Sequence, residues 1–210
     1  CTFLVDLAEG KKSLPDPPIA SIGYQASIVI TPQQEADMDI KATLNNLLIP
    51  YTSNYAGTLL PGIREYTVTP GEKTTTISGK GKAGLKQEEN YYFFYLPVCY
   101  KGITGKSYAY YNTSRSKNLY LPASVDENYS YDIQLPENLT LCTPIQEKKI
   151  DNPIGSFKIT LTSEGSSLHI ELALQIKKQL ITPAEYPAFR SLITEWTDRT
   201  RKPILFKTVQ

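Results

Sequence analysis

The sequence lacks most of the side chains on which hydrolytic enzymes depend. Its 210 residues contain one histidine, His169, together with one methionine, one tryptophan and three cysteines. A catalytic triad or a multi-histidine metal site needs an imidazole close to a nucleophile or to further ligands, and the spacing around His169 supplies neither. We therefore predict no catalytic residues, no metal site and no cofactor.

The three cysteines are too far apart for the short paired spacings that zinc sites and redox motifs use. Cys99 and Cys142 could form one disulfide in an oxidising compartment. Two half-buried thiols in a β core explain the same residues equally well. The sequence leaves both alternatives open.

The chain also lacks a charge excess and long apolar runs. Twenty-two basic residues against 21 acidic ones leave a net charge of +1, so no broad basic surface is expected and nucleic acid is not a predicted partner. The longest apolar runs fall well short of the roughly 20 residues of a membrane-spanning helix, so we predict no membrane span here. Fifteen tyrosines and many Ser, Thr and Asn beside one methionine are typical of an extracytoplasmic β protein.

Alternating apolar and polar residues are the clearest structural signal that is present. They fill residues 157–162 and 168–176, and a turn-forming segment between the two runs predicts a β-hairpin. Residues 129–135 alternate in the same way until Pro136 ends the pattern. Three amphipathic strands in a row predict an antiparallel sheet. Further strands are expected within residues 2–7, 26–31, 39–48, 65–69, 74–78 and 203–209.

One helix is predicted after the long strand. Its apolar face comprises Tyr186, Phe189, Leu192, Ile193 and Trp196, spaced by three and four residues. We place its start near Tyr186, because the following proline is tolerated only in the first turn.

The polar, glycine-rich segment 79–84 predicts a loop and a boundary between an N-terminal β region, residues 1–80, and a β-sandwich-like domain, residues 85–210. The predicted fold class is all-β, with sandwich-like antiparallel sheets and one C-terminal α-helix.

Aromatic residues crowd the middle of the chain. The run 91–95 (YYFFY) is predicted to be a core strand covered on both sides. Tyr108, Tyr110 and Tyr111 stand among Gly, Lys, Ser and Asn, so they are candidate binding residues. Exposed tyrosines stack on sugars or anchor a protein partner.

From residue 91 onward the chain resembles the uncharacterised C-terminal domain that follows a transglutaminase-like core in large bacterial cell-envelope proteins. The resemblance is carried by the blocks YYFFYLP (91–97), SR (114–115), LYLP (119–122), YSYDIQLP (129–136), IDNPIGSF (150–157) and ITPAEYPAFR (181–190). It implies an N-terminal β domain, a papain-like Cys-His-Asp core and this terminal module, which has no known biochemical activity. It also implies a location in the periplasm or cell envelope, where the larger protein could provide a membrane tether. The residues of that core cannot be mapped onto this chain.

These observations favour a non-catalytic accessory, structural or protein-interaction module of a larger transglutaminase-like protein. Its expected partner is an adjacent domain or another protein. One alternative is a carbohydrate-binding module in which the exposed tyrosines contact a glycan. Another is a hydrolase that uses two carboxylates, which requires a cleft where Asp and Glu converge.

Overall fold

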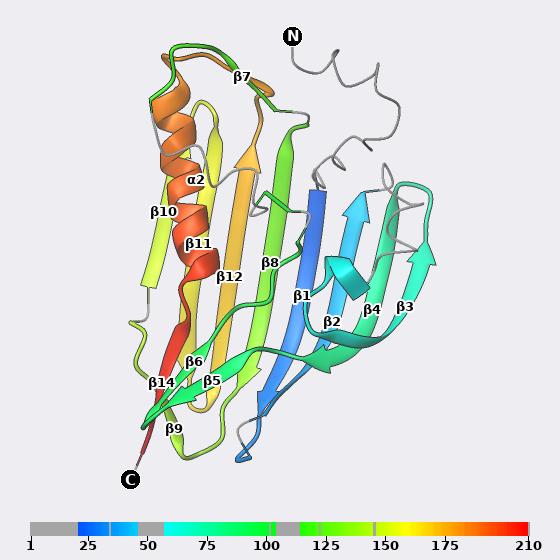
Figure 1. Ribbon diagram of the computed structural model, residues 1–210, viewed down its shortest axis with the longest axis vertical. Helices are drawn as coiled ribbons and strands as arrows, with labels where there is room; N and C mark the ends of the chain where they lie inside the picture. Colours follow the sequence, from blue (N-terminus) through cyan, green and yellow to red (C-terminus); the bar gives the residue numbers. More distant parts are fainter. Residues whose placement is uncertain are drawn as a thin grey trace, which may run out of the picture.

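The fold consists of one large sheet with a second layer on one of its faces. The computed structural model describes residues 21–33, 35–45, 57–100, 102–103, 114–121, 123–144 and 146–209. Within them the chain forms an eight-stranded sheet, a four-stranded sheet, a two-stranded ribbon and a long helix. The helix and the four-stranded sheet cover the same face of the large sheet (Figure 1). The predicted all-β class with one C-terminal helix is confirmed.

The large sheet has the strand order β10-β11-β12-β8-β1-β2-β4-β3. β1 and β8 run parallel, whereas the other neighbours are antiparallel. The sheet is therefore mixed, although the sequence predicted antiparallel pairing alone. Its strands are β1 (Ser21–Ile30), β2 (Ala36–Asn45), β3 (Ile63–Pro70), β4 (Thr74–Lys82), β8 (Val125–Gln134), β10 (Gln146–Asn152), β11 (Gly155–Glu164) and β12 (Ser167–Ile176).

The parallel pair β1 and β8 brings strands from both predicted regions, 1–80 and 85–210, into one sheet. The predicted glycine-rich loop is wrong over most of its length, because β4 continues to Lys82. Gly79 and Gly81 permit close strand packing instead of flexibility. A Cβ atom on Gly79 would lie 2.1 Å from the carbonyl oxygen of Glu65 on β3, so a side chain at this position would force the two strands apart.

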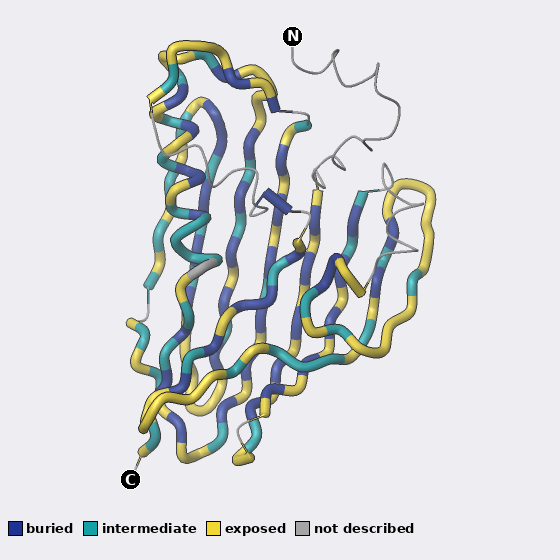
Figure 2. The backbone as a smooth tube through the Cα atoms, in the orientation of Figure 1, coloured by how far each residue is buried: buried dark blue, intermediate teal, exposed yellow. Residues whose placement is uncertain are grey.

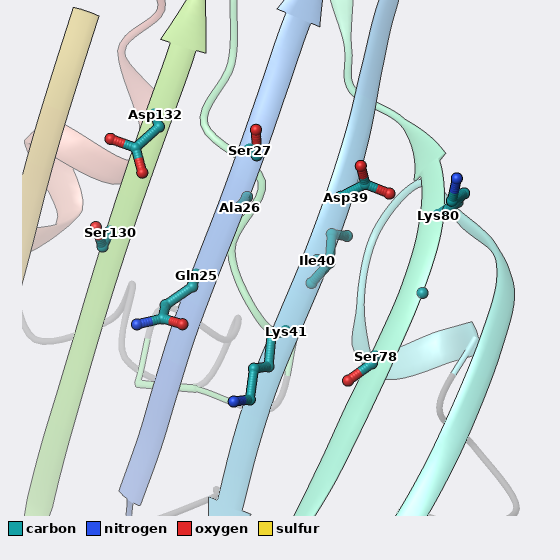
Figure 3. A pocket seen from close by; sticks show the side chains of 11 residues that line it. Gln25, Ala26, Ser27, Asp39, Ile40, Lys41, Ser78, Lys80, Ser130 and Asp132 are labelled. Carbon is teal, nitrogen blue, oxygen red and sulfur yellow. The ribbon is translucent and has the colours of Figure 1, made fainter.

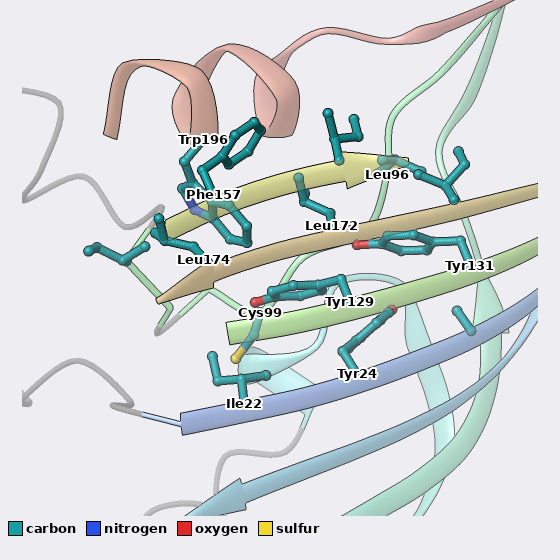
Figure 4. Packing of buried hydrophobic residues seen from close by; sticks show 14 of the residues in the cluster. Ile22, Tyr24, Leu96, Cys99, Tyr129, Tyr131, Phe157, Leu172, Leu174 and Trp196 are labelled. Carbon is teal, nitrogen blue, oxygen red and sulfur yellow. The ribbon is translucent and has the colours of Figure 1, made fainter. Parts of the chain in front are cut away.

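Burial alternates along the long strands as the periodicity predicted. Every second side chain of β1, β8 and β12 is buried and the others reach solvent (Figure 2). The buried side contains an aromatic cluster of Tyr24, Tyr129, Tyr131 and Trp196 (Figure 4). Ring centroids in this cluster lie 5.3 to 6.3 Å apart, which is the spacing of packed aromatic pairs.

The four-stranded sheet forms part of the covering layer, in the order β5-β6-β14-β9. Its strands are β5 (Leu85–Glu88), β6 (Tyr91–Phe94), β9 (Leu139–Leu141) and β14 (Ile204–Thr208), and the ribbon pairs β7 (Leu119–Tyr120) with β13 (Leu180–Ile181). Tyr92 and Phe94 are buried, whereas Tyr91 and Tyr95 are 38% and 39% exposed. The prediction that this run is covered on both sides is therefore wrong, because the outer face of the small sheet meets solvent.

Helix α2 (Tyr186–Arg201) begins at the predicted residue and buries all five residues of its predicted apolar face. The turn before it is held by Glu185, whose carboxylate accepts hydrogen bonds from the Thr182 backbone N–H at 3.1 Å and from its hydroxyl at 3.0 Å. A hydrogen bond from Lys178 is the largest of the contacts that lower the pKa of Glu185 to about 2. The charged carboxylate thus stabilises the turn that immediately precedes the helix.

Candidate functional site: the open face of the large sheet

No described helix or strand covers one face of the large sheet (Figure 1). We call the outward side chains of its strands the open face. Strand register aligns these side chains in rows that cross the sheet. One row contains, in spatial order, Lys80, Asp39, Ser27, Asp132 and His169. Residues that lie far apart in the chain thus form one continuous polar surface.

On β8, β11 and β12 four charged or titratable side chains of the open face pair with one another within the sheet. His169 Nδ1 lies 2.7 Å from Asp132 Oδ1, and its Nε2 lies 3.6 Å from Glu171 Oε1. The Lys158 ammonium lies 3.6 Å from the other oxygen of Glu171. The hydrogen bond to Asp132 is the largest cause of a raised His169 pKa.

The contacts of His169 fit a network of surface ion pairs better than acid–base catalysis. A histidine that acts as a base needs an unprotonated ring nitrogen directed at a reacting group. Both nitrogens of His169 instead face carboxylates, which favours the imidazolium form. The imidazole therefore connects β12 to β8 through Asp132 and lies beside Glu171 of its own strand.

A shallow hollow of about 640 Å³ lies over β1, β2 and β4 on the same face. Asp39, Lys41 and Lys80 project along it, and Ser27 and Ser78 are among the small residues between them (Figure 3). Within the described part of the chain these three charged side chains form no ion pair. This half of the open face consequently presents charges that a partner can complement.

The open face is hydrophilic. Across the described strands of the large sheet, its outward residues include no Phe, Tyr or Trp, and Val29 is its one exposed large apolar side chain. A sugar ring stacks on aromatic faces, whereas a polar protein surface is matched by alternating charges and hydrogen-bonding groups. The composition of this face favours the second kind of partner.

The predicted site residues lie elsewhere. Tyr108, Tyr110 and Tyr111 fall outside the described residues, so their binding role stays a prediction. Cys99 is buried beneath the large sheet beside Tyr129 (Figure 4), whereas Cys142 is exposed next to β9. The structure does not join these two cysteines to each other.

The sequence interpretation missed a buried carboxylate, Glu127. Its position on β8 belongs to the inward set, which alternation would have revealed. Its carboxylate accepts hydrogen bonds from the Ile103 backbone N–H at 2.5 Å and from the Tyr129 hydroxyl at 3.1 Å. Burial raises its pKa to about 7. A Cβ on Gly102 would lie 2.6 Å from Glu127 Oε2, so this acid fixes the segment 102–103 against the sheet.

Two further features of the described residues bear on function. No group of three His, Cys, Asp or Glu side chains among them could hold a metal ion. The described helix is too short and too polar to cross a membrane.

Comparisons with known proteins cover a little over half of the chain. The family model of a domain of unknown function with solved structure, DUF3858, matches residues 90–206. The crystal structure of a "putative protease" from Parabacteroides distasonis is similar, with a TM-score of 0.51 and 31% identity over 58% of this chain. The chain spans about a quarter (24%) of that protein. No curated protein matches the sequence.

Proposed function

The chain belongs to the DUF3858 family, whose members are domains of unknown function, and from this premise we propose that it is a non-catalytic accessory domain of a larger transglutaminase-like protein of the cell envelope. In this role the open face docks against a neighbouring domain of the same polypeptide, outside the cytoplasm. The observation that carries the proposal is the charge-bearing face of the eight-stranded sheet, which none of the described elements covers.

The size of the open face supports docking of a whole domain. Seven strand spacings of about 4.8 Å and strands of ten residues at about 3.3 Å each give roughly 34 by 33 Å, or about 1,100 Å². The large sheet has eight strands, and its five central and longest strands have ten residues each. Domain interfaces within a chain bury roughly 600–1,500 Å² and are more polar than permanent subunit interfaces.

The distribution of charge supports the same role. A partner that contributes carboxylates opposite Lys41 and Lys80, and a cation opposite Asp39, would complement the hollow. The similar solved structure supports a neighbour in the same polypeptide, since this chain corresponds to only 24% of it. A large part of such a protein is thus available to occupy the open face.

Docking predicts that lysines of the open face become protected in the full-length polypeptide. We expect Lys41 and Lys80, both exposed in this chain, to react with an acetylating reagent on the order of tenfold more slowly in the longer protein. Quantitative mass spectrometry of the two preparations measures this ratio.

Lys86 and Lys207 provide the matched control for this measurement. They are exposed on the small sheet and lie over Tyr95 and Tyr91, away from the open face. Their reactivity should be the same in both preparations. Equal reactivity of Lys41 and Lys80 in the two proteins, or a gene that encodes no neighbouring domain, would overturn the proposal.

A non-catalytic role also predicts that the purified chain has no thiol-dependent hydrolase or acyl-transfer activity. A catalytic thiol needs a base that stabilises its thiolate. The single histidine lies on the open face, whereas Cys99 is buried beneath the opposite face of the sheet. Peptide hydrolysis and transfer of a fluorescent amine to glutamine are suitable assays. Turnover that disappears in Cys99→Ala or Cys142→Ala would refute the prediction.

A further inference from the structure

The outer face of the four-stranded sheet presents a row of aromatic side chains. Tyr91, Phe93 and Tyr95 alternate with two buried residues along β6 and one position beyond it. Tyr95 continues the extended path, because its backbone N–H donates to the Gly84 carbonyl oxygen at 3.3 Å. Alternate residues of a strand point to the same side, so the three rings form a row about 13 Å long. We call these three residues the aromatic strip.

The aromatic strip lies at the surface. Tyr91 and Tyr95 are 38% and 39% exposed, and Phe93 is half-buried between them. Leu205 of β14 pairs with Phe93 and is half-buried as well, so it widens the apolar surface. Contiguous apolar side chains at the surface mark a contact site.

An ammonium group lies near each end of the aromatic strip. Lys207 Nζ lies 5.8 Å from the centre of the Tyr91 ring, and Lys86 Nζ lies 5.6 Å from that of Tyr95. Neither lysine forms an ion pair with any of the described residues. Both distances are close to the limit of about 6 Å for cation–π attraction, so each ammonium can turn toward an anion at little cost. Each end of the strip thus combines an aromatic ring with a cation.

The small sheet has a positive outer face. Glu88, which pairs with Tyr91, is the one acidic residue at an outward position of its four described strands. Lys86 and Lys207 occupy outward positions on the two strands that flank β6. Two ammonium groups against one carboxylate favour an anionic ligand.

The dimensions of this face fit a short oligosaccharide better than a protein. Three strand spacings of about 4.8 Å and a row of about 13 Å give roughly 190 Å², whereas each partner of a stable protein interface contributes about 800 Å². The C–H groups of a sugar ring pack on the electron-rich face of an aromatic ring. A carboxylate on that sugar lies at the edge of the stack, beside the ammonium. In a nucleic acid, a pentose separates each phosphate from the stacked base.

We propose that the aromatic strip binds an acidic oligosaccharide, in which sugar rings stack on Tyr91 and Tyr95 and their carboxylates pair with Lys207 and Lys86. Charge-assisted hydrogen bonds to the two ammonium groups select sugars that carry a carboxylate. The strip and the open face lie on opposite sides of the large sheet (Figure 1). Binding at one surface therefore does not depend on the docking proposed for the other.

The test is a titration of the intact chain, followed by NMR, with tetragalacturonate and with its methyl ester, which has the same sugar rings without their charge. We expect the acid to bind about fivefold more tightly, the factor that two solvent-exposed ion pairs give. Lys207→Gln should reduce this preference to about twofold. Tyr91→Ala should weaken the binding of both ligands several-fold, because it removes one stacking ring.

Tyr120→Ala and Lys73→Gln are the matched controls. Tyr120 is 69% exposed on β7, and Lys73 is exposed between β3 and β4, so both lie outside the small sheet. Each variant should bind both ligands as the unchanged chain does. Equal affinity for acid and ester, a Tyr91→Ala variant with unchanged affinity, or tetrathymidylate that binds as tightly as tetragalacturonate would each overturn the proposal.

Acetylation provides a second readout that is separate from the test of docking. Tetragalacturonate should slow the acetylation of Lys86 and Lys207 in this chain and leave that of Lys41 and Lys80 unchanged. Equal slowing at all four lysines would mean that the anion binds to any exposed ammonium, and this would also overturn the proposal. None of these results would alter the comparison of Lys41 and Lys80 between this chain and the longer protein.

Discussion

Replacing Trp196 by alanine is expected to lower the free energy of unfolding by about 3–5 kcal/mol. Trp196 is fully buried and is the largest side chain of the core. Its ring lies 5.7 Å from that of Tyr129, which joins α2 to β8 of the large sheet. Truncation would remove this contact and leave a cavity between the helix and the sheet. Urea unfolding followed by far-UV circular dichroism would measure the change.

Two control variants separate the packing of Trp196 from other effects. Trp196→Phe should cost less than half as much, because the indole Nε1 has no hydrogen-bond partner among the described residues and a phenyl ring fills most of the volume. Leu180→Ala, at a position 51% exposed, should change stability by no more than about 0.5 kcal/mol. A loss below about 1 kcal/mol for Trp196→Ala would show that the helix does not stabilise the fold.

Local sequence patterns were sufficient to predict much of this fold. The alternation in residues 157–162 and 168–176 predicted the β11–β12 hairpin, whose register pairs Phe157 with Leu174. The spacing of the apolar residues from Tyr186 to Trp196 predicted the buried face of α2. These elements are predictable because neighbouring residues determine both the backbone period and the buried side.

Long-range arrangement was not predictable from the same patterns. The parallel pairing of β1 with β8 joins residues about 100 positions apart, and no local signal selects it. The glycines at 79 and 81 suggested a loop, but the close approach of the β3 backbone explains them. Whether both faces of β6 are covered likewise depends on which layer packs against it. Such outcomes follow from tertiary packing and override local preference.

The candidate site could not be predicted either, because tertiary packing brings its residues together. Asp39, Lys41 and Lys80 read individually as the outward residues that strand alternation requires, and only the β2–β4 register places them around one hollow. Sequence spacing identifies such polar groups, but the fold decides which of them share a surface.

Glu127→Gln is expected to stabilise the protein at pH 8 relative to the unchanged chain, with little difference at pH 4.5. The pKa of Glu127 is about 7 in the folded state and about 4.5 without the fold. A raised pKa means that ionisation opposes folding, so the stability present below pH 4.5 is lost as the pH rises to about 7. The difference of about 2.5 pH units corresponds to about 3 kcal/mol. Urea unfolding of both proteins at the two pH values would measure it.

The comparison isolates the charge of Glu127, because the glutamine oxygen can still accept the Ile103 N–H hydrogen bond. The titratable groups that interact with Glu127 are the phenols of Tyr129 and Tyr131, both of which burial keeps neutral. Glu137→Gln, at an exposed position before β9, should show no such pH dependence. An equal change in stability at pH 4.5 and pH 8 would instead mean that the hydrogen bonds to residue 127, not its buried charge, determine how firmly segment 102–103 is held.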